Sequence, residues 1–188
     1  MGSKSRGRVS KTGRVGEGLA EYLKHYYVDS IFSVGVGCGF NEYHIKKNYP
    51  FCTITCADFT KNAIYRLKNV FHECDNFELF DLLKQPLTAP FSLLCRVDTD
   101  LTNEQWSDVF SRSRSQYILM VYCQLITPLR AYILWKDNII STVALRRGTL
   151  AGYKRTRRTF ESLWHGYYSV SDRPIIGGLQ AVLLEKID

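Results

Sequence analysis

The stretch Ser33–Glu42 decides the fold: it reads S-V-G-V-G-C-G-F-N-E, with glycine at positions 35, 37 and 39 directly after the apolar run I-F-S-V. Glycine has no Cβ, so a loop of this kind lets a ligand lie directly on the main chain. Two common phosphate-binding patterns do not fit. No G-K-[ST] follows, and Phe40 stands where the fingerprint G-x-G-x-x-G requires its last glycine. The pattern G-x-G-x-G therefore predicts a different ligand site at the end of a strand.

A carboxylate follows the glycines at an informative distance. The β-branched run C-T-I-T-C-A predicts the next strand, and it ends at Asp58, 19 residues after Gly39. Rossmann-like sites place an acid about 20 residues after their glycines, where it binds ribose hydroxyls. A carboxylate can accept two hydrogen bonds from such a diol. We therefore expect Asp58 to lie beside the glycine loop. The alternative is that Asp58 caps the next helix, a role for which Thr60 competes.

Strands and helices alternate along the chain. The patterns predict strands at 30–36, 52–57, 77–81, 91–98, 116–123, 167–171 and 179–187, and helices at 16–27, after the glycines, at 60–71, from 102 to about 110 and at 156–165. This alternation predicts an α/β fold: a doubly wound, mostly parallel sheet of about seven strands with helices on both faces. The last two strands are joined by only about seven residues, so they must pair antiparallel. We expect a basic flexible arm at 1–14 and one domain at 15–188.

Four motifs resemble the successive motifs of class I, Rossmann-like S-adenosylmethionine-dependent methyltransferases. They are S-V-G-V-G-C-G, A-D-F-T-K-N-A-I, F-E-L-F-D-L and L-L-C-R-V-D, and the likeness extends over about residues 16–187. The resemblance implies S-adenosylmethionine as the cofactor. It implies that Asp58 holds the ribose, that Phe59 lies against the adenine, and that Asp81 takes the adenine amino group. The implied main-chain contacts to the cofactor come from Gly35, Gly37, Gly39 and Leu82.

The same resemblance implies where chemistry occurs. Asp98, at the end of the fourth strand, would face the methyl group, and either Asp98 or Asp100 could act as a base, with Tyr122 nearby. The cofactor brings the difficult chemistry, so the protein mainly aligns the reactants. One position departs from the family pattern: Ser33 stands where an Asp or Glu is usual, two residues before the first glycine. Glu17 or Glu42 could replace that acid, or the chain could be a non-catalytic member.

The positive charge of the chain is concentrated in two segments that contain no acid. They hold Lys4, Arg6, Arg8, Lys11 and Arg14, and then Arg146, Arg147, Lys154, Arg155, Arg157 and Arg158. Such segments attract polyanions, so residues 1–14 and 146–158 indicate a partner such as a nucleic acid or an anionic membrane surface. An RNA methyltransferase is one hypothesis. Lys24, Asp98 and Lys154 could supply three members of the Lys-Asp-Lys-Glu tetrad of ribose methylation, but Gln180 stands where the tetrad would need its Glu. A small-molecule or protein methyltransferase and a non-catalytic binding protein are the alternatives.

Composition indicates a cytoplasmic protein. The six cysteines form no C-x-x-C pair, which favours reduced, buried thiols over disulfides or zinc. No run reaches the ~18 apolar residues of a membrane span, and the N-terminus lacks the apolar block of a signal peptide. The four histidines show no ligand spacing, so we expect no metal. The sequence leaves the oligomeric state open.

Overall fold

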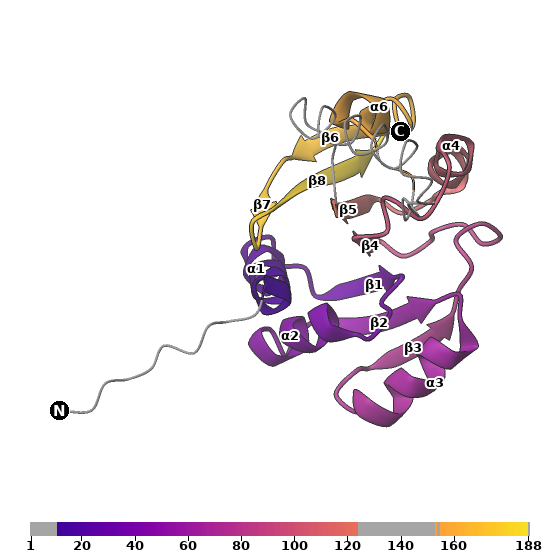
Figure 1. Ribbon diagram of the computed structural model, residues 1–188. Helices are drawn as coiled ribbons and strands as arrows, with labels where there is room; N and C mark the ends of the chain where they lie inside the picture. Colours follow the sequence, from indigo (N-terminus) through magenta and orange to yellow (C-terminus); the bar gives the residue numbers. More distant parts are fainter. Residues whose placement is uncertain (1–10, 124–152, 154, 188) are drawn as a thin grey trace, which may run out of the picture.

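The computed structural model describes residues 11–123, 153 and 155–187, which form an eight-stranded sheet with helices on both faces (Figure 1). The strands are β1 (Ser30–Val34), β2 (Thr53–Asp58), β3 (Asn76–Leu79), β4 (Phe91–Cys95), β5 (Tyr117–Val121), β6 (Tyr168–Asp172), β7 (Ile175–Ile176) and β8 (Leu179–Lys186). The helices are α1 (Lys11–His25), α2 (Phe40–Asn48), α3 (Lys61–Val70), α4 (Asn103–Arg112) and α6 (Arg157–Glu161).

The strand order is β3-β2-β1-β4-β5-β8-β6, with β7 paired to β8. The first five strands of the chain are parallel, and β8 runs antiparallel to both β5 and β6. This confirms the predicted doubly wound sheet and its antiparallel closing pair. The order reverses between β1 and β4, and ligands of open α/β sheets bind at the carboxyl ends of the strands at such a point.

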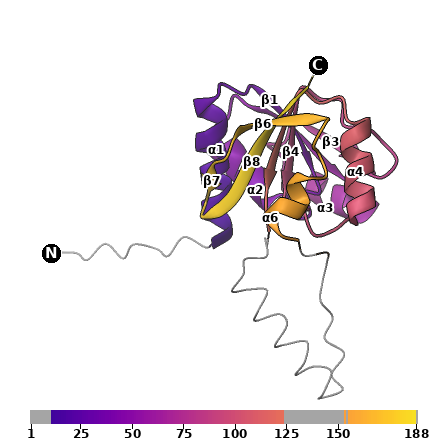
Figure 2. The ribbon, with the colours of Figure 1, turned by 90° about the horizontal axis from the view of Figure 1, so that it is seen from above.

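Two apolar layers cover the sheet, because successive strand residues point to opposite faces. Cys56 of β2 belongs to the layer that includes Leu19 of α1, Ile45 of α2 and Leu67 of α3. Its neighbour Ala57 belongs to the other layer, to which α4 and α6 contribute a stacked and edge-on aromatic group: Trp106, Phe110 and Phe160. In the view from above, α1 and α4 lie on opposite sides of the sheet (Figure 2). Because the helices cover the two faces of the sheet, the carboxyl ends of the central strands are left for a functional site.

The first helix is longer than its sequence pattern predicts. It begins at Lys11 rather than near residue 16, so residues 11–14 belong to α1 and not to the expected arm. The remainder of that arm, residues 1–10, lies outside the described residues. The glycines in this helix lower its intrinsic propensity, but Val15, Leu19 and Leu23 are buried against the sheet. Tertiary packing therefore outweighs local propensity here.

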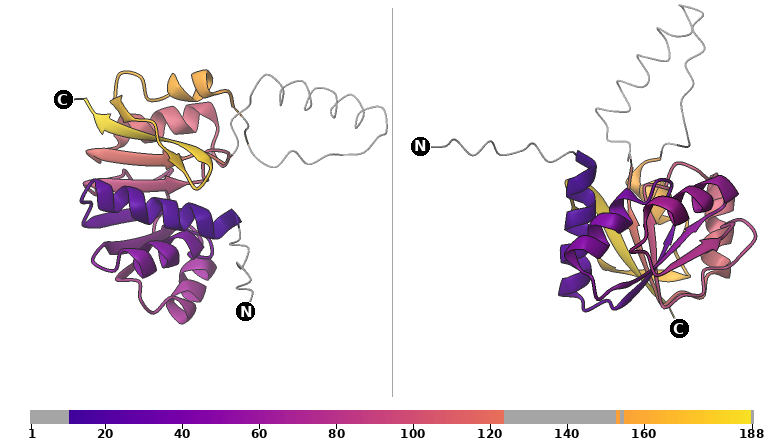
Figure 3. Two further views of the ribbon diagram at one scale, coloured as in Figure 1. Left: turned by 90° about the vertical axis from the view of Figure 1, so that its left-hand side faces the viewer. Right: turned by 90° about the horizontal axis from the view of Figure 1, so that it is seen from below.

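The link of about seven residues between the last two predicted strands, D-R-P-I-I-G-G, contains the short strand β7. Gly177 and Gly178 have positive φ angles of 57° and 86° and connect Ile176 to its partner Leu179. Two successive positive φ values are what a tight hairpin turn requires, and glycine provides them without strain. The tip of this hairpin reaches α1 (Figure 3), where a Cβ on Gly177 would lie 2.5 Å from the Cα of Val15.

Two further features bear on the predicted setting of the protein. All six cysteines are free thiols, and Cys52, Cys56, Cys74 and Cys95 are buried. Among the described helices, none combines the length and the apolar character needed to cross a membrane.

Candidate functional site

The glycine loop follows β1 and turns into α2. Gly35, Gly37 and Gly39 have φ angles of 74°, 58° and 68°, a region that costs other residues about 1–2 kcal/mol. A Cβ on Gly39 would lie 2.5 Å from the Cδ2 of Leu67, whereas a Cβ on Gly37 would meet no atom within 4 Å. Gly37 therefore presents its main chain to open space. Gly39 instead allows α2 to begin and to pack closely against α3.

Asp58 lies against this loop, where the sequence spacing predicts it. Its Oδ2 accepts a hydrogen bond from the Gly37 amide at 3.2 Å, and its Oδ1 accepts from the Thr60 amide at 2.9 Å and from the Thr60 hydroxyl. Thr60 is the N-cap residue of α3, but its side chain does not cap the helix. The carboxylate of Asp58 thus joins the glycine loop to the start of α3.

A cavity of about 840 Å³ opens beside the glycine loop, at the carboxyl ends of the parallel strands. The predicted residues that line it are Gly35, Gly37, Asp58, Phe59, Asp81, Leu82 and Asp100. Phe59 is 70% exposed, so one ring face is free for a ligand. Asp81 accepts a hydrogen bond from the Leu83 amide at 3.0 Å, and its ion pair with Lys84 lowers the pKa of Asp81. One cavity therefore joins residues from the ends of β1, β2, β3 and β4.

Only one of the three proposed catalytic residues lines the cavity. Asp100 lines the cavity, and partial desolvation raises its pKa, opposed by a weak contact with the Thr99 hydroxyl. Asp98 is buried, and its Oδ1 accepts a hydrogen bond from the Cys123 amide at 2.7 Å. Tyr122 is buried edge-on against Phe160, with ring centroids 5.6 Å apart. Neither Asp98 nor Tyr122 lines the cavity, so Asp100 is the predicted base that the structure places there.

The sequence interpretation missed three aromatic residues of the cavity wall, Phe80, Trp106 and Tyr153. Trp106 is fully buried, and its Nε1 has no hydrogen-bond partner among the described residues. The Tyr153 amide donates to the Thr99 carbonyl at 2.7 Å, which fixes Tyr153 beside the loop that carries Asp100. Trp106 lies in the first turn of α4, directly after the loop that follows β4, and this position could have identified it as a residue of the cavity wall. Tyr153 follows a segment with no readable pattern.

Arg155, part of the second basic segment, is buried rather than free to bind a phosphate. Its Nη1 donates to the carbonyls of Asp98 and Tyr153 at 2.7 and 3.0 Å, its Nη2 donates to the Leu101 carbonyl, and its Nε donates to the Asn103 side chain. Arg157 is paired with Glu161 at 2.6 Å. Arg146, Arg147 and Lys154 lie outside the described residues. The guanidinium of Arg155 thus holds the 98–103 loop in place.

Ser33, the departure from the family pattern, has a carboxyl group beside it. Its hydroxyl donates to the Oε1 of Glu42 at 2.6 Å, and both side chains are almost fully buried. Burial raises the pKa of Glu42, and the hydrogen bond from Ser33 partly opposes this shift. The sequence left Glu17 and Glu42 as alternatives for the missing acid. Of the two, Glu42 is the one that contacts Ser33.

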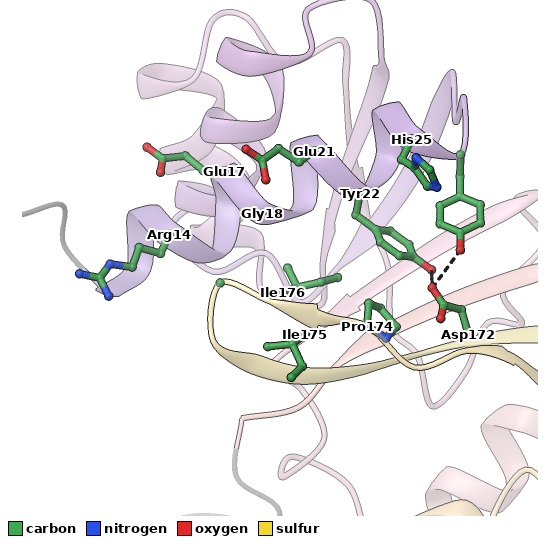
Figure 4. A pocket seen from close by; sticks show the side chains of 12 residues that line it. Arg14, Glu17, Gly18, Glu21, Tyr22, His25, Asp172, Pro174, Ile175 and Ile176 are labelled. Atoms are coloured by element: carbon green, nitrogen blue, oxygen red, sulfur yellow. Dashed lines mark hydrogen bonds between the residues drawn. The ribbon is translucent and has the colours of Figure 1, made fainter.

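Glu17 lies instead in a second hollow of about 570 Å³, between α1 and the C-terminal strands. Figure 4 shows Tyr22 pointing toward Asp172. The Oδ2 of Asp172 accepts hydrogen bonds from the hydroxyls of Tyr22 and Tyr26 at 3.0 and 2.9 Å. Burial and the carboxylate of Asp172 raise the pKa of Tyr22 far above its ordinary value. This hollow shares no lining residue with the cavity at the glycine loop. Within the part of the chain that the structure describes, no group of His, Cys, Asp and Glu side chains could hold a metal ion.

Comparison with known proteins gives a match only at the level of structure. No family model matches the chain, and no curated protein resembles it significantly in sequence. The mitomycin 7-O-methyltransferase MmcR superposes with a TM-score of 0.72 at 15% identity, over 95% of this chain and 54% of that one. Human N-acetylserotonin methyltransferase, in complex with S-adenosylmethionine, gives 0.62 at 20% identity, over 92% and 52%.

A third similar structure is closer to this chain in length. Magnesium protoporphyrin IX methyltransferase from Synechocystis PCC 6803, with bound S-adenosylhomocysteine, gives a TM-score of 0.66 at 12% identity, over 93% of this chain and 82% of that one. The chain spans about half the length of the other two structures. These similarities establish the fold.

Proposed function

We propose that this chain binds S-adenosylmethionine and methylates a small molecule. The proposal starts from the class I S-adenosylmethionine-dependent methyltransferase fold, which the chain shares with those structures. The observation that carries the proposal is the contact between Asp58 and the Gly37 amide on the wall of the 840 Å³ cavity. It brings an open stretch of main chain and a diol-binding carboxylate to one place. Both groups suit an adenosine ligand.

Each predicted cofactor residue that lines the cavity has a chemically suitable position. The open space over Gly37 leaves room for a ligand where a side chain would intrude. Asp58 offers two oxygens to the ribose hydroxyls, and the exposed ring of Phe59 offers an apolar face to the adenine. Asp81 keeps an ionised carboxylate at the far side of the cavity, where it can accept from an amino group. Gly39 supports this arrangement through packing.

When bound, the cofactor supplies an activated methyl group, and the protein has to orient the acceptor and remove its proton. Asp100 is the base that we assign, because it lines the cavity and its pKa is raised by partial desolvation. A raised pKa brings a carboxylate closer to the operating pH, where a general base is most effective. The hydrogen bond from the Tyr153 amide to the Thr99 carbonyl holds the backbone directly before Asp100. Asp98 is assigned a structural role on the Cys123 amide.

The acceptor we propose is a small molecule rather than a nucleic acid. The acceptor side of the cavity has apolar and aromatic walls, formed by Val97, Leu101, Trp106 and Tyr153. Apolar walls with a few polar groups are typical of small-molecule sites. The burial of Arg155 and the pairing of Arg157 also remove two of the cations that a phosphate-binding role would use. The three similar enzymes are also named for small molecules: N-acetylserotonin, mitomycin and magnesium protoporphyrin IX.

Titration calorimetry with S-adenosylhomocysteine tests this function. We expect saturable binding of one ligand per chain, with a dissociation constant inside the range of about 1 μM to 1 mM that is usual for enzyme ligands. Adenosine should compete with it, because the contacts proposed for Asp58 and Phe59 are to the adenosine part. If neither compound gives heat or competition at about 1 mM, the cofactor assignment is wrong.

A further inference from the structure

We propose that Cys56 and Cys74 form a redox-active thiol pair, in which a peroxide oxidises Cys74 and the two cysteines then join in an intramolecular disulfide. This proposal adds a modification site to the chain and does not depend on the proposed methyltransferase function. It starts from one contact: the Sγ atoms of the two residues lie 3.3 Å apart.

The local structure holds the two sulfur atoms together. Cys56 lies in β2, where the sheet pairs it with β1 on one side and with β3 on the other, so its main chain is fixed. Cys74 lies in the link between α3 and β3. Its Sγ lies 3.1 Å from the Asn76 carbonyl oxygen and 3.4 Å from the Ile54 carbonyl oxygen, and the second of these contacts places it against β2.

The next residue, Asp75, fastens this link to β2. Its Oδ2 accepts hydrogen bonds from the Ile54 amide at 2.8 Å and from the Nζ of Lys46 at 2.7 Å. A disulfide requires a sulfur–sulfur distance of about 2.05 Å, so the two atoms need to approach by only about 1 Å. Because Cys74 belongs to the link and not to a strand, it can make this movement without a change in the register of β2 and β3.

The two thiols differ in exposure and in acidity, and these differences assign their roles. Cys74 is 8% exposed, whereas Cys56 is completely buried, so an oxidant from solvent reaches Cys74 first. Contact with the Cys56 thiol lowers the pKa of Cys74, and burial opposes that shift. The same contact and burial raise the pKa of Cys56. Because the thiolate is the reactive form, Cys74 is the attacking thiol and Cys56 is the resolving thiol.

The oxidation takes two steps, with hydrogen peroxide as the oxidant. The Cys74 thiolate attacks one peroxide oxygen, so that an S–O bond forms, the O–O bond breaks, and the leaving hydroxide takes up the proton that the thiol released. The Cys56 sulfur then attacks the sulfenic sulfur, so that the S–S bond forms, the S–O bond breaks, and the hydroxyl leaves as water with the proton of Cys56. The two thiols lose two electrons and two protons, and the peroxide becomes two molecules of water.

The disulfide would enclose α3, because it joins residues on either side of that helix. Helix α3 packs closely beneath the glycine loop, where a Cβ on Gly39 would lie 2.5 Å from the Cδ2 of Leu67. Closing a loop between residues that are 18 positions apart removes freedom from the unfolded chain, which stabilises the folded chain. The oxidised chain should therefore melt about 5–10 °C above the reduced chain.

Peptide mapping of the folded full chain after treatment with hydrogen peroxide tests the proposal. Free thiols are blocked with N-ethylmaleimide, and digestion with trypsin follows without reductant. Cleavage after lysine places Cys74 on peptide 69–84 and Cys56 on peptide 48–61, which also contains Cys52. We expect the two peptides to be joined, and dithiothreitol should separate them. The variant Cys52→Ala removes the ambiguity within peptide 48–61 and should give the same joined pair.

Two single variants distinguish the attacking thiol from the resolving thiol, and a third is the matched control. In Cys56→Ser the sulfenic acid on Cys74 has no partner, so dimedone should label peptide 69–84. In Cys74→Ser, peptide 48–61 should take up no dimedone, and oxidation should not raise the melting temperature. Cys38→Ser, which removes an exposed thiol, should form the disulfide as the unmodified chain does.

Four results would overturn the proposal. They are a treated chain without joined peptides, a bond from Cys74 to Cys52, dimedone on peptide 48–61 of Cys74→Ser, and an oxidised chain that melts no later than the reduced chain. The last result would mean that the bond forms only in a distorted fold. Joined peptides with later melting, both absent from Cys56→Ser and Cys74→Ser, would support it.

Discussion

The variant Asp58→Ala should bind S-adenosylhomocysteine at least about tenfold more weakly than the unmodified chain, because hydrogen bonds to a charged group contribute about 1.5–3 kcal/mol each. The carboxylate lies on the cavity wall and already accepts from the Gly37 amide, so its loss also frees the glycine loop. Calorimetry measures the affinity, and thermal unfolding shows whether the fold persists. Asp58→Asn, which keeps one acceptor oxygen for the loop, should show an intermediate affinity.

Asp108→Ala is the matched control for Asp58. Asp108 is an exposed carboxylate in α4, paired with Arg112 at 2.8 Å, and it does not line the glycine-loop cavity. Surface pairs of this kind contribute about 0–1 kcal/mol, so neither affinity nor folding should change appreciably. If Asp58→Ala binds S-adenosylhomocysteine as tightly as Asp108→Ala, Asp58 does not hold the ligand.

The variant Arg155→Ala should lower the free energy of unfolding by about 3 kcal/mol or more, because hydrogen bonds to a charged group contribute about 1.5–3 kcal/mol each and this guanidinium makes several. The guanidinium donates to the carbonyls of Asp98, Leu101 and Tyr153 and to the side chain of Asn103. Its removal leaves buried acceptors unsatisfied, at about 1–3 kcal/mol for each. Urea denaturation monitored by tryptophan fluorescence measures the loss.

Arg158→Ala is the control for Arg155, since Arg158 carries the same charge three residues later and is exposed. Exposed substitutions usually change stability by no more than about 0.5 kcal/mol. Equal stabilities of the two variants would contradict the structural role of Arg155. A loss confined to Arg155 would confirm that this part of the basic segment builds the acceptor side of the cavity.

The sheet and the contact between Asp58 and the glycine loop could be predicted because both depend on local patterns. Apolar runs set where the strands lie, and parallel strands bring their carboxyl ends to one edge. The spacing from the glycines to Asp58 therefore fixed a three-dimensional contact, now seen at 3.2 Å to the Gly37 amide. The helix predicted from 102 to about 110 is present as α4, and it opens with a capping box formed by Thr102 and Gln105.

The cavity wall around Asp100, Trp106 and Tyr153 could not be predicted, because it depends on where side chains point after distant segments meet. Asp98 and Tyr122 do follow strands β4 and β5, but one binds the Cys123 amide and the other packs on Phe160. Arg155 stands among basic residues that suggest a solvent-exposed surface, and only its contacts with the 98–103 loop bury it. Glu42 was one of two candidates until its contact with Ser33 was visible.

A crystal structure with S-adenosylhomocysteine tests the central claim most directly. We predict that the ligand lies on the main chain at Gly37 and that the Asp58 carboxylate oxygens lie within about 3 Å of both ribose hydroxyls. A ligand bound in the hollow beside Asp172, or one in the larger cavity with its ribose turned away from Asp58, would contradict the account.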